Sequence, residues 1–309
     1  MRPSVAITIR SFDPEGGAMQ ELRDHAHITF WNRHGRRMKE EELRAAVQEA
    51  EGVIAGTEQF TAGVLGQAPR LKVISRVGSG TDSIDLASAQ QRGIRICTTP
   101  NSVVQPVAEH TIALILSVLK GIPAYDAGMR RGDHAVKAGT LLAGKTVGII
   151  GLGRIGFRVA SLLDALGCRI LFYDSFSIRD VPGTWKPAGS VEDILGQSDI
   201  VTLHAGPQAD NTPLLSADRF RTARKGIVII NTARGSLIDE GAMAEALKDG
   251  TVSGAGLDVF QQEPYTGPLL AFSQVVATPH VASNTRESRG EMELEAVRNL
   301  LAALRDGTA

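Results

Sequence analysis

The sequence predicts an α/β protein with two doubly wound parallel-sheet domains. Short β-branched runs alternate with longer helix-like stretches along the whole chain, which is typical of parallel sheets covered by helices on both faces. The 309 residues exceed the length of one typical domain and fit two. Near the middle of the chain, a short apolar run leads directly into a glycine-rich turn, which indicates where the second sheet begins.

The first hundred residues predict a small open sheet. Strands are expected at residues 5–9, 52–55, 72–76 and 94–97. From Pro106, a favourable first residue for a helix, apolar residues recur at helical spacing up to Gly121, which is a plausible stop. We expect this helix to carry the chain into the second domain.

The second domain is expected to hold a larger sheet, with helical stretches before most of its strands. Asp239 and Gly250 predict the N-cap and the C-terminal stop of one of these helices. Turn residues predict a surface loop over 175–187, and helical spacing predicts a last helix over about 284–306. The predicted domains are residues 1–100 together with 285–309, and residues 101–284. The expected strands of the second domain are residues 145–151, 169–173, 200–204, 227–231, 254–259 and 275–277.

Composition favours a small-molecule partner. The chain has 33 Lys plus Arg against 34 Asp plus Glu, so no strong field attracts nucleic acid or an anionic membrane. The longest apolar stretch, residues 111–119, is too short to cross a bilayer, and no secretory signal opens the chain, so a cytoplasmic location is expected. Cys97 and Cys168 form no CxxC pair, and no Cys/His cluster has metal-ligand spacing, so no metal site is expected.

The glycine-rich turn matches GxGxxG and predicts a Rossmann-type dinucleotide site. Gly151 would permit the tight turn, Gly153 would let a pyrophosphate approach the backbone, and Gly156 would let helix and strand pack closely. The N-terminus of the following helix would face the anion, with Arg154 beside it and Ile155 inside the motif. The motif alone is weak evidence, because glycines also gather in ordinary turns.

An acidic residue at the end of the next strand favours NAD over NADP. Asp174 could accept hydrogen bonds from the adenosine ribose hydroxyls and would repel a 2′-phosphate. The alternative is that Asp174 only caps a loop. Arg179, a few residues later, keeps NADP open as the less favoured cofactor.

Three candidate catalytic residues follow the ends of later strands, where an open α/β sheet binds its ligands. Arg234 could grip a substrate carboxylate through two parallel hydrogen bonds, although alone it also fits a surface ion pair. Taken separately, Glu263 fits an ordinary loop carboxylate and His280 a structural histidine.

Together, these motifs resemble the D-isomer-specific 2-hydroxyacid dehydrogenase family over nearly the whole chain. The resemblance implies that Arg234 binds the substrate carboxylate, His280 is the acid/base and Glu263 is its carboxylate partner. An imidazolium can protonate the oxygen that hydride transfer leaves behind, and a carboxylate would stabilise that imidazolium. The predicted function is therefore an NAD-dependent oxidoreductase, a 2-keto acid reductase that forms D-2-hydroxy acids. The matching segments are residues 77–85, 107–114, 144–156, 231–239, 256–260, 263–264 and 278–282.

The resemblance also implies a flavodoxin-like substrate domain into which the Rossmann-type cofactor domain is inserted. Its glycine loop would face the substrate carboxylate, and Arg76 before the loop would contact a substrate phosphate or a second carboxylate, or else form a surface ion pair. Asp258 would face the nicotinamide carboxamide, and Ser79 would also touch the nicotinamide side. The implied substrate-binding residues are Arg76, Val77, Gly78, Ser79, Gly80 and Arg234. The further implied cofactor residues are Thr111, Ala205, Thr232, Ala233, Asp258 and Ser79.

One alternative from another class stays open. Some relatives of this family act as transcriptional corepressors, so a non-catalytic NAD(H)-sensing binding protein would share the fold and the cofactor site. The combined presence of Arg234, Glu263 and His280 favours catalysis. Formate dehydrogenases share the fold but carry glutamine where this chain has Glu263. By resemblance alone, we expect a homodimer.

Overall fold

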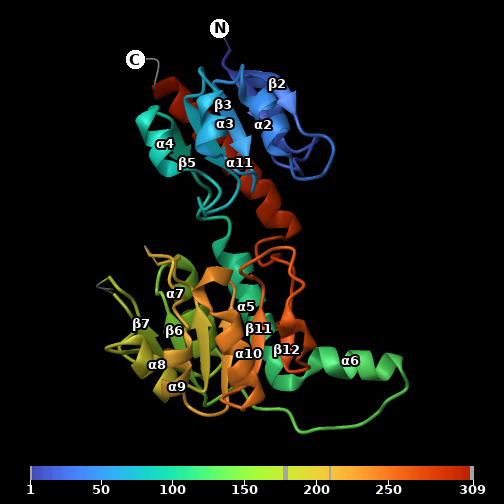
Figure 1. Cartoon of the computed structure of the whole chain (residues 1–309), viewed down its shortest axis with the longest axis vertical. Helices are drawn as coiled ribbons and strands as arrows, with labels where there is room; N and C mark the ends of the chain where they lie inside the picture. The colour runs from blue at the N-terminus through green and yellow to red at the C-terminus, as the bar shows by residue number, and fades with distance from the viewer. Residues whose placement is uncertain (1, 177–179, 209, 307–309) are drawn as a thin grey trace. The chain divides into compact units, whose positions relative to one another are not determined.

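The computed structural model describes residues 2–176, 180–208 and 210–306 (Figure 1). The chain divides into two compact units. The first, here called the terminal unit, combines Met1–Val103 with Asn284–Ala309, and the second, here called the inserted unit, is Val104–Ser283. The chain enters the inserted unit once and then returns to the terminal unit, so each unit is described by itself.

The terminal unit contains a five-stranded parallel sheet in the order β2-β1-β3-β4-β5, which is the flavodoxin-like order. Helices α2, α3 and α4 cover one face, and α1 and α11 pack together over the other. The glycine at position 52 lets α11 approach this second face, because a Cβ there would lie 2.9 Å from Leu300 Cδ1. The strands are β1 (Ser4–Ile7), β2 (His27–Trp31), β3 (Gly52–Ala55), β4 (Val73–Arg76) and β5 (Arg95–Cys97). The helices are α1 (Gly17–His25), α2 (Glu40–Val47), α3 (Ala62–Gly66), α4 (Leu86–Gln91) and α11 (Arg286–Asp306).

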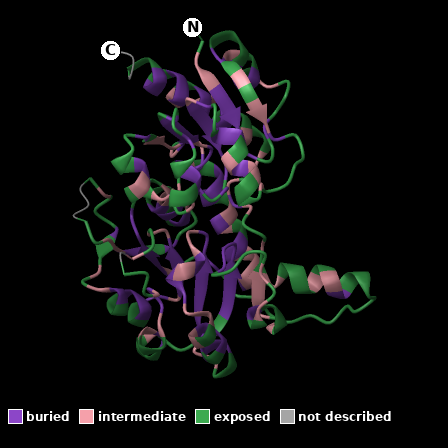
Figure 2. Cartoon of the chain, turned by 45° about the horizontal axis from the view of Figure 1, so that its top comes forward, coloured by how far each residue is buried: buried purple, intermediate pink, exposed green. Residues whose placement is uncertain are grey.

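The inserted unit contains a seven-stranded parallel sheet in the order β12-β11-β10-β9-β6-β7-β8. This is the Rossmann strand order extended by one strand. The strands that follow β6 lie first on one side of it and, from β9 on, on the other side, so the strand order reverses between β6 and β9. The inner strands of this sheet are among the buried segments of Figure 2, whereas both residues of the edge strand β8 are exposed. The strands are β6 (Thr146–Ile150), β7 (Arg169–Tyr173), β8 (Lys186–Pro187), β9 (Ile200–Leu203), β10 (Ile227–Asn231), β11 (Val252–Leu257) and β12 (Val275–Ala277).

Two apolar cores cover the two faces of this larger sheet. Helices α5 and α7 pack on one face, and α8, α9 and α10 pack on the other. Both fold predictions, the α/β class and the two parallel sheets, are confirmed. The helices are α5 (Val104–Lys120), α6 (Ile122–Arg130), α7 (Arg154–Ala165), α8 (Val191–Gln197), α9 (Ala217–Thr222) and α10 (Glu240–Lys248), with short 3₁₀ helices η1 (Gly235–Leu237) and η2 (Pro268–Ala271).

The loop expected over residues 175–187 is wrong at its end. Lys186–Pro187 form β8, which pairs with β7 at the edge of the sheet. Trp185 is only 4% exposed, because its ring lies 5.1 Å from that of Phe157 and its Nε1 donates a hydrogen bond to Asp164. Arg179, which keeps NADP open as the less favoured cofactor in the sequence analysis, lies outside the described residues.

Strand β2 was not predicted from the sequence. It is an edge strand, and none of its five residues is fully buried, so it lacks the apolar run that marks the inner strands. By contrast, the Asp239 N-cap is confirmed, since its side chain accepts a hydrogen bond from the N–H of Ala242. The helix predicted from Pro106 begins two residues earlier, at Val104.

No single helix within the described ranges is long and apolar enough to span a membrane; α5 and α6 meet that test only as a pair bent by 63°. Within the same ranges, no group of three or more His, Cys, Asp or Glu side chains could hold a metal ion. Cys97 and Cys168 are free thiols.

Candidate active site

The predicted cofactor and catalytic residues of the inserted unit gather at one edge of its sheet. Because all seven strands are parallel, the segments that follow them lie at the same edge. These segments carry Gly151 after β6, Asp174 after β7, Ala205 after β9, Arg234 after β10, Asp258 and Glu263 after β11, and His280 after β12.

The three motif glycines differ in what surrounds them. Gly151 has φ +90°, and a Cβ there would lie 2.7 Å from the backbone N of Ala205. A Cβ on Gly156 would lie 2.0 Å from the carbonyl oxygen of Gly151, so only glycine lets α7 pack against the end of β6. A Cβ on Gly153 would meet nothing within 4 Å, which leaves open space beside the turn.

The start of α7 is suited to hold an anion. Gly153 is its N-cap and provides no side-chain cap for the first N–H groups of the helix. Arg154 is exposed at the first helical position, whereas Ile155 packs partly against the core. Open space, uncapped N–H groups and a cation together fit a dinucleotide pyrophosphate.

Asp174 is tied to the glycine turn. One carboxylate oxygen accepts the N–H of Leu152 at 2.6 Å, and the other accepts the N–H of Phe176 at 2.9 Å. The capping role considered as an alternative is therefore present. Each ionised carboxylate oxygen has more than one acceptor position, so the side chain also retains capacity for ribose hydroxyls.

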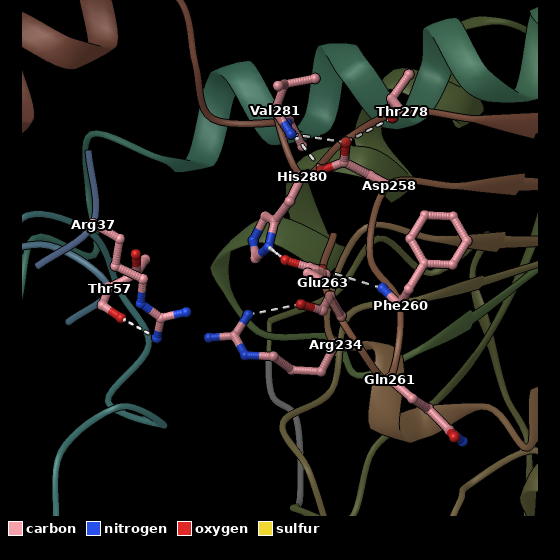
Figure 3. Close-up of polar contacts among 12 residues, drawn as sticks. Arg37, Thr57, Arg234, Asp258, Phe260, Gln261, Glu263, Thr278, His280 and Val281 are labelled. Carbon is pink, nitrogen blue, oxygen red and sulfur yellow. Dashed lines mark hydrogen bonds and ion pairs between the residues drawn. The ribbon is translucent and has the colours of Figure 1, made fainter. Parts of the chain in front are cut away.

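His280 and Glu263 form a hydrogen-bonded pair (Figure 3). The distance from His280 Nδ1 to Glu263 Oε2 is 2.8 Å, and Glu263 Oε1 accepts the N–H of Phe260 at 3.2 Å. An ionised carboxylate only accepts, so Nδ1 donates and Nε2 remains on the other side of the ring. The side chains are 47% and 38% exposed, so the pair can reach a ligand.

The loop after β10 places Arg234. Buried Asn231 accepts the N–H of Ala233 at 3.0 Å and donates to the carbonyl of Arg234 at 2.8 Å. A Cβ on Gly235 would lie 1.9 Å from the carbonyl carbon of Phe260, so glycine brings this loop onto the one that holds Glu263. In Figure 3, the side chains of Arg234 and His280 extend to the same side.

Asp258 organises the segment that carries His280. Its side chain is fully buried, and its carboxylate accepts the N–H groups of Val281 and Ala282, both at 2.9 Å. Its main-chain carbonyl accepts the N–H of His280 at 2.8 Å. These contacts hold the backbone of the segment that carries His280, and the contact of Asp258 with the nicotinamide carboxamide stays a prediction.

Thr111 and Thr232 meet although 121 positions separate them in the sequence. Their hydroxyl oxygens lie 2.9 Å apart, and Thr111 also donates to the carbonyl of Val107 at 2.7 Å. A hydroxyl has one hydrogen, so Thr232 must donate to Thr111. The oxygen of Thr232 is then left as an acceptor.

His204 follows β9 beside the glycine turn. Burial lowers the pKa of its imidazole to about 3, so the ring is neutral at neutral pH. Its Nε2 lies 2.9 Å from the hydroxyl of Thr202. The sequence analysis did not select this residue.

The predicted substrate loop belongs to the terminal unit and follows β4. The N–H of Val77 donates to Ala55, and that of Gly78 donates to the hydroxyl of Thr99 at 2.7 Å. The N–H groups of exposed Ser79 and half-buried Gly80 therefore remain as the expected backbone donors to the substrate carboxylate. Gly78 has φ +131°, and the Arg76 guanidinium lies where a Cβ of Gly78 would be.

Besides His204, three supporting residues were not selected as site residues from the sequence: His110, Asn231 and Thr278. Each lies inside a segment that was matched to the family, and each is a polar residue near a strand end or on the covering helix. For Asn231 that position is a usable signal, because a buried polar side chain at the ligand edge of a sheet needs a partner.

A family model matches the inserted unit. The model describes the NAD binding domain of D-isomer specific 2-hydroxyacid dehydrogenases, and it matches residues 112–282. The chain belongs to the D-isomer specific 2-hydroxyacid dehydrogenase family. The family resemblance found in the sequence is thereby confirmed.

Some relatives match this chain along nearly their whole length, and others match it along about half of theirs. A glyoxylate reductase of Aeropyrum pernix is 34% identical over 97% of this chain and 92% of its own length. A D-3-phosphoglycerate dehydrogenase of Mycobacterium tuberculosis is 36% identical over 85% of this chain, but over only 51% of its own length. The chain therefore spans about half the length of the phosphoglycerate dehydrogenases it matches.

Solved structures of similar proteins cover both units. The TT0316 protein of Thermus thermophilus has a TM-score of 0.88 and 34% identity, covering 98% of this chain and 97% of its own. An NADPH-dependent glyoxylate/hydroxypyruvate reductase of Sinorhizobium meliloti has a TM-score of 0.88 and 27% identity, covering 99% and 96%. The second of these proteins is named as NADPH-dependent, so a protein with this fold can also use NADPH.

Proposed function

We propose that the protein is an NAD-dependent dehydrogenase that interconverts a small 2-keto acid and its D-2-hydroxy acid. The observation that carries this proposal is the 2.8 Å hydrogen bond between His280 Nδ1 and Glu263 Oε2, at the ligand edge of a dinucleotide-type sheet. Family membership and the glycine turn supply the redox class, because the nicotinamide cofactor provides the hydride.

In this proposal, His280 supplies the proton in keto acid reduction. With Nδ1 held by Glu263, Nε2 is the nitrogen that faces the reacting oxygen. The imidazolium donates its Nε2 proton as negative charge develops on that oxygen, and the neutral imidazole accepts a proton in the reverse direction. Glu263 stabilises the imidazolium and fixes the orientation of the ring.

Arg234 would bind the substrate carboxylate. A guanidinium can form two parallel hydrogen bonds to a carboxylate, which fixes both position and direction of the keto group. Orientation of this kind lowers a barrier by up to roughly 7–11 kcal/mol. The N–H groups of Ser79 and Gly80 are proposed as further carboxylate donors, and Arg76 as a contact for a second anionic group.

NAD is the proposed cofactor. The turn fits a dinucleotide, with open space at Gly153 for a pyrophosphate and Arg154 at the exposed start of α7. Asp174 lies beside this turn, where its negative charge would repel a 2′-phosphate. Thr232, left as an acceptor, and neighbouring Ala233 and Ala205 would contact the cofactor.

Among 2-keto acids, we propose a short one such as glyoxylate. The Aeropyrum pernix relative that matches along nearly its whole length is named a glyoxylate reductase. The phosphoglycerate dehydrogenases match only half of their own length, which makes them weaker guides to the substrate.

A panel of keto acids assayed with NADH and NADPH side by side tests these proposals. We expect NADH oxidation with glyoxylate or hydroxypyruvate, and little with NADPH. Binding of NADH without reduction of glyoxylate, hydroxypyruvate, pyruvate, 2-ketoglutarate, phenylpyruvate or phosphohydroxypyruvate would instead support a non-catalytic NAD(H)-sensing protein or corepressor. Preference for phosphohydroxypyruvate would support the phosphate role of Arg76.

We also propose that the protein is a homodimer. Helix α6 and the segment after it extend away from the sheet of the inserted unit and are largely exposed (Figures 1 and 2). Ile122, Met129, Val136 and Leu141 expose apolar side chains there. Exposure of several large apolar side chains on one projecting segment is the feature that supports contact with another chain. Light scattering should give the mass of two chains, and a Val136→Asp variant should shift it toward one.

A further inference from the structure

A chain of hydrogen bonds links helix α5 to the segment that carries His280. His110 Nε2 lies 3.0 Å from the hydroxyl oxygen of Thr278, and that hydroxyl lies 2.6 Å from Asp258 Oδ1. Nε2 is also 3.5 Å from the same carboxylate oxygen. All three residues belong to the inserted unit, and Figure 3 shows Thr278 and Asp258 beside His280.

Counting hydrogens fixes the direction of this chain. Asp258 already accepts backbone N–H groups on both carboxylate oxygens, as an ionised carboxylate does. Thr278 therefore donates its single hydrogen to Asp258 and can only accept from His110. It follows that His110 carries a hydrogen on Nε2.

The far end of the chain determines where His280 lies. His280 has φ +55°, in the left-handed region, which costs an L-residue about 1–2 kcal/mol. This backbone conformation is held by the main-chain carbonyl of Asp258, which accepts the N–H of His280, and by its carboxylate, which accepts the next two N–H groups. A carboxylate that shifted would move the imidazole.

We infer that His110 is a positioning residue for His280 and acts through Thr278 and Asp258. This inference rests on the proposed function for its effect on turnover, but its structural part does not. His110 donates from Nε2 to Thr278, which orients the threonine hydroxyl toward Asp258. The Asp258 carboxylate is thereby held where it accepts the two N–H groups that follow His280. The side chain of His110 is 21% exposed and that of Asp258 is fully buried, so the hydrogen-bond chain runs from a partly exposed residue to a buried one.

Two matched variants of His110 separate positioning from bulk. His110→Gln retains an N–H donor at the end of the side chain, whereas His110→Phe fills similar space without a donor. We expect His110→Phe to lower kcat roughly 3- to 10-fold, the effect of losing one hydrogen bond, with the Kd for NADH unchanged and the melting temperature lowered by no more than a few degrees. His110→Gln should restore most of kcat. Equal kcat in wild type and His110→Phe would overturn the inference.

Thr278 provides a second test of the same chain. Thr278→Ser retains the hydroxyl and should retain kcat, while Thr278→Val removes it and should reproduce the loss seen in His110→Phe. The double variant His110→Phe with Thr278→Val should be no worse than either single variant, since both break one chain. Additive losses would show that the two residues act separately.

Nuclear magnetic resonance tests the inference without relying on turnover. In protein labelled with ¹⁵N-histidine, His110 should show a protonated Nε2 and an unprotonated Nδ1 when neutral. The His280 ring signals should shift in His110→Phe and return in His110→Gln. A hydrogen on Nδ1 of His110, or unchanged His280 signals, would overturn the inference. If the wild type reduced no keto acid yet these signals behaved as expected, only the proposed function would fail.

Discussion

A Cβ atom on Gly156 would lie 2.0 Å from the carbonyl oxygen of Gly151, far inside van der Waals contact. This close approach lets the first turn of α7 pack against the end of β6 and brings the N–H groups at its start next to the turn. Gly153, only three residues away, has no such neighbour. We therefore propose different purposes for the two glycines, Gly156 in folding and Gly153 in binding.

Substitution by alanine should separate these two purposes. Gly156→Ala should lower the melting temperature by several degrees and abolish NADH binding, since backbone must move to admit the methyl group. Gly153→Ala should leave the melting temperature unchanged and weaken NADH at least tenfold, because its methyl group would occupy the space proposed for the pyrophosphate. Thermal unfolding and fluorescence titration give both values. Normal NADH affinity in Gly153→Ala would argue against the proposed pyrophosphate position.

Replacement of His280 should affect the reaction and spare the cofactor. We expect His280→Gln to lower kcat by about 10²- to 10⁴-fold while the Kd for NADH stays nearly constant, because the imidazole acts on the substrate oxygen. His27→Gln is the matched control, since His27 is exposed at the start of β2. Steady-state rates and fluorescence titration would check both variants. Equal losses of binding and rate would point to a structural histidine.

Arg234 should be sensitive even to lysine. Arg234→Lys preserves the charge but loses the planar pair of donors, so we expect the KM for the keto acid to rise at least tenfold. Arg221→Lys, at an exposed ion pair on α9, should change nothing. Initial rates over a range of keto acid concentrations distinguish the two variants. An unchanged KM in Arg234→Lys would place the substrate carboxylate elsewhere.

Asp174 should control cofactor choice. Asp174→Asn retains an oxygen that can accept the N–H of Leu152, yet it removes the negative charge that would repel a 2′-phosphate. We expect the ratio of kcat/KM for NADPH over NADH to rise about tenfold or more, with little change in melting temperature. If the wild type already used both cofactors equally, this role of Asp174 would be wrong.

Much of the fold could be predicted because its signals are local. The inner strands, such as β7 and β10, are continuous apolar runs, and the sequence marks both ends of each. The edges of the sheets gave weaker signals. Strand β2 has no fully buried residue and β8 has only two residues, and both form because a neighbouring strand offers unpaired backbone groups.

The candidate site could be predicted only as a set of residue types at strand ends. Which of them would meet was accessible only through the family resemblance, since Glu263 and His280 lie 17 positions apart and on different strand ends. The role of Asp258 beneath the His280 segment could not be read from the sequence. It depends on the left-handed backbone at His280 and on N–H groups whose direction only the fold determines.

Burial of His204 should make stability depend on pH. Its pKa is lowered to about 3 by burial, whereas an unfolded histidine titrates near its model value of 6.5. Below pH 6.5 the unfolded chain binds a proton that the folded chain does not, so unfolding becomes easier as the pH falls toward 3. One such proton changes the free energy of unfolding by about 1.4 kcal/mol per pH unit at most.

The variant His204→Gln should remove the contribution of this histidine to the pH dependence of stability. Its amide can still bond to Thr202, but it takes up no proton, so the stability of the variant should fall less steeply from pH 6.5 toward the folded pKa of about 3. Urea unfolding at several pH values measures the slopes, and His27→Gln, at an exposed histidine of β2, serves as the control. Parallel slopes for wild type and His204→Gln would mean that this half-buried imidazole gains a proton as readily as an exposed one. The ring would then have to be reached by water or paired with an acceptor in the folded protein.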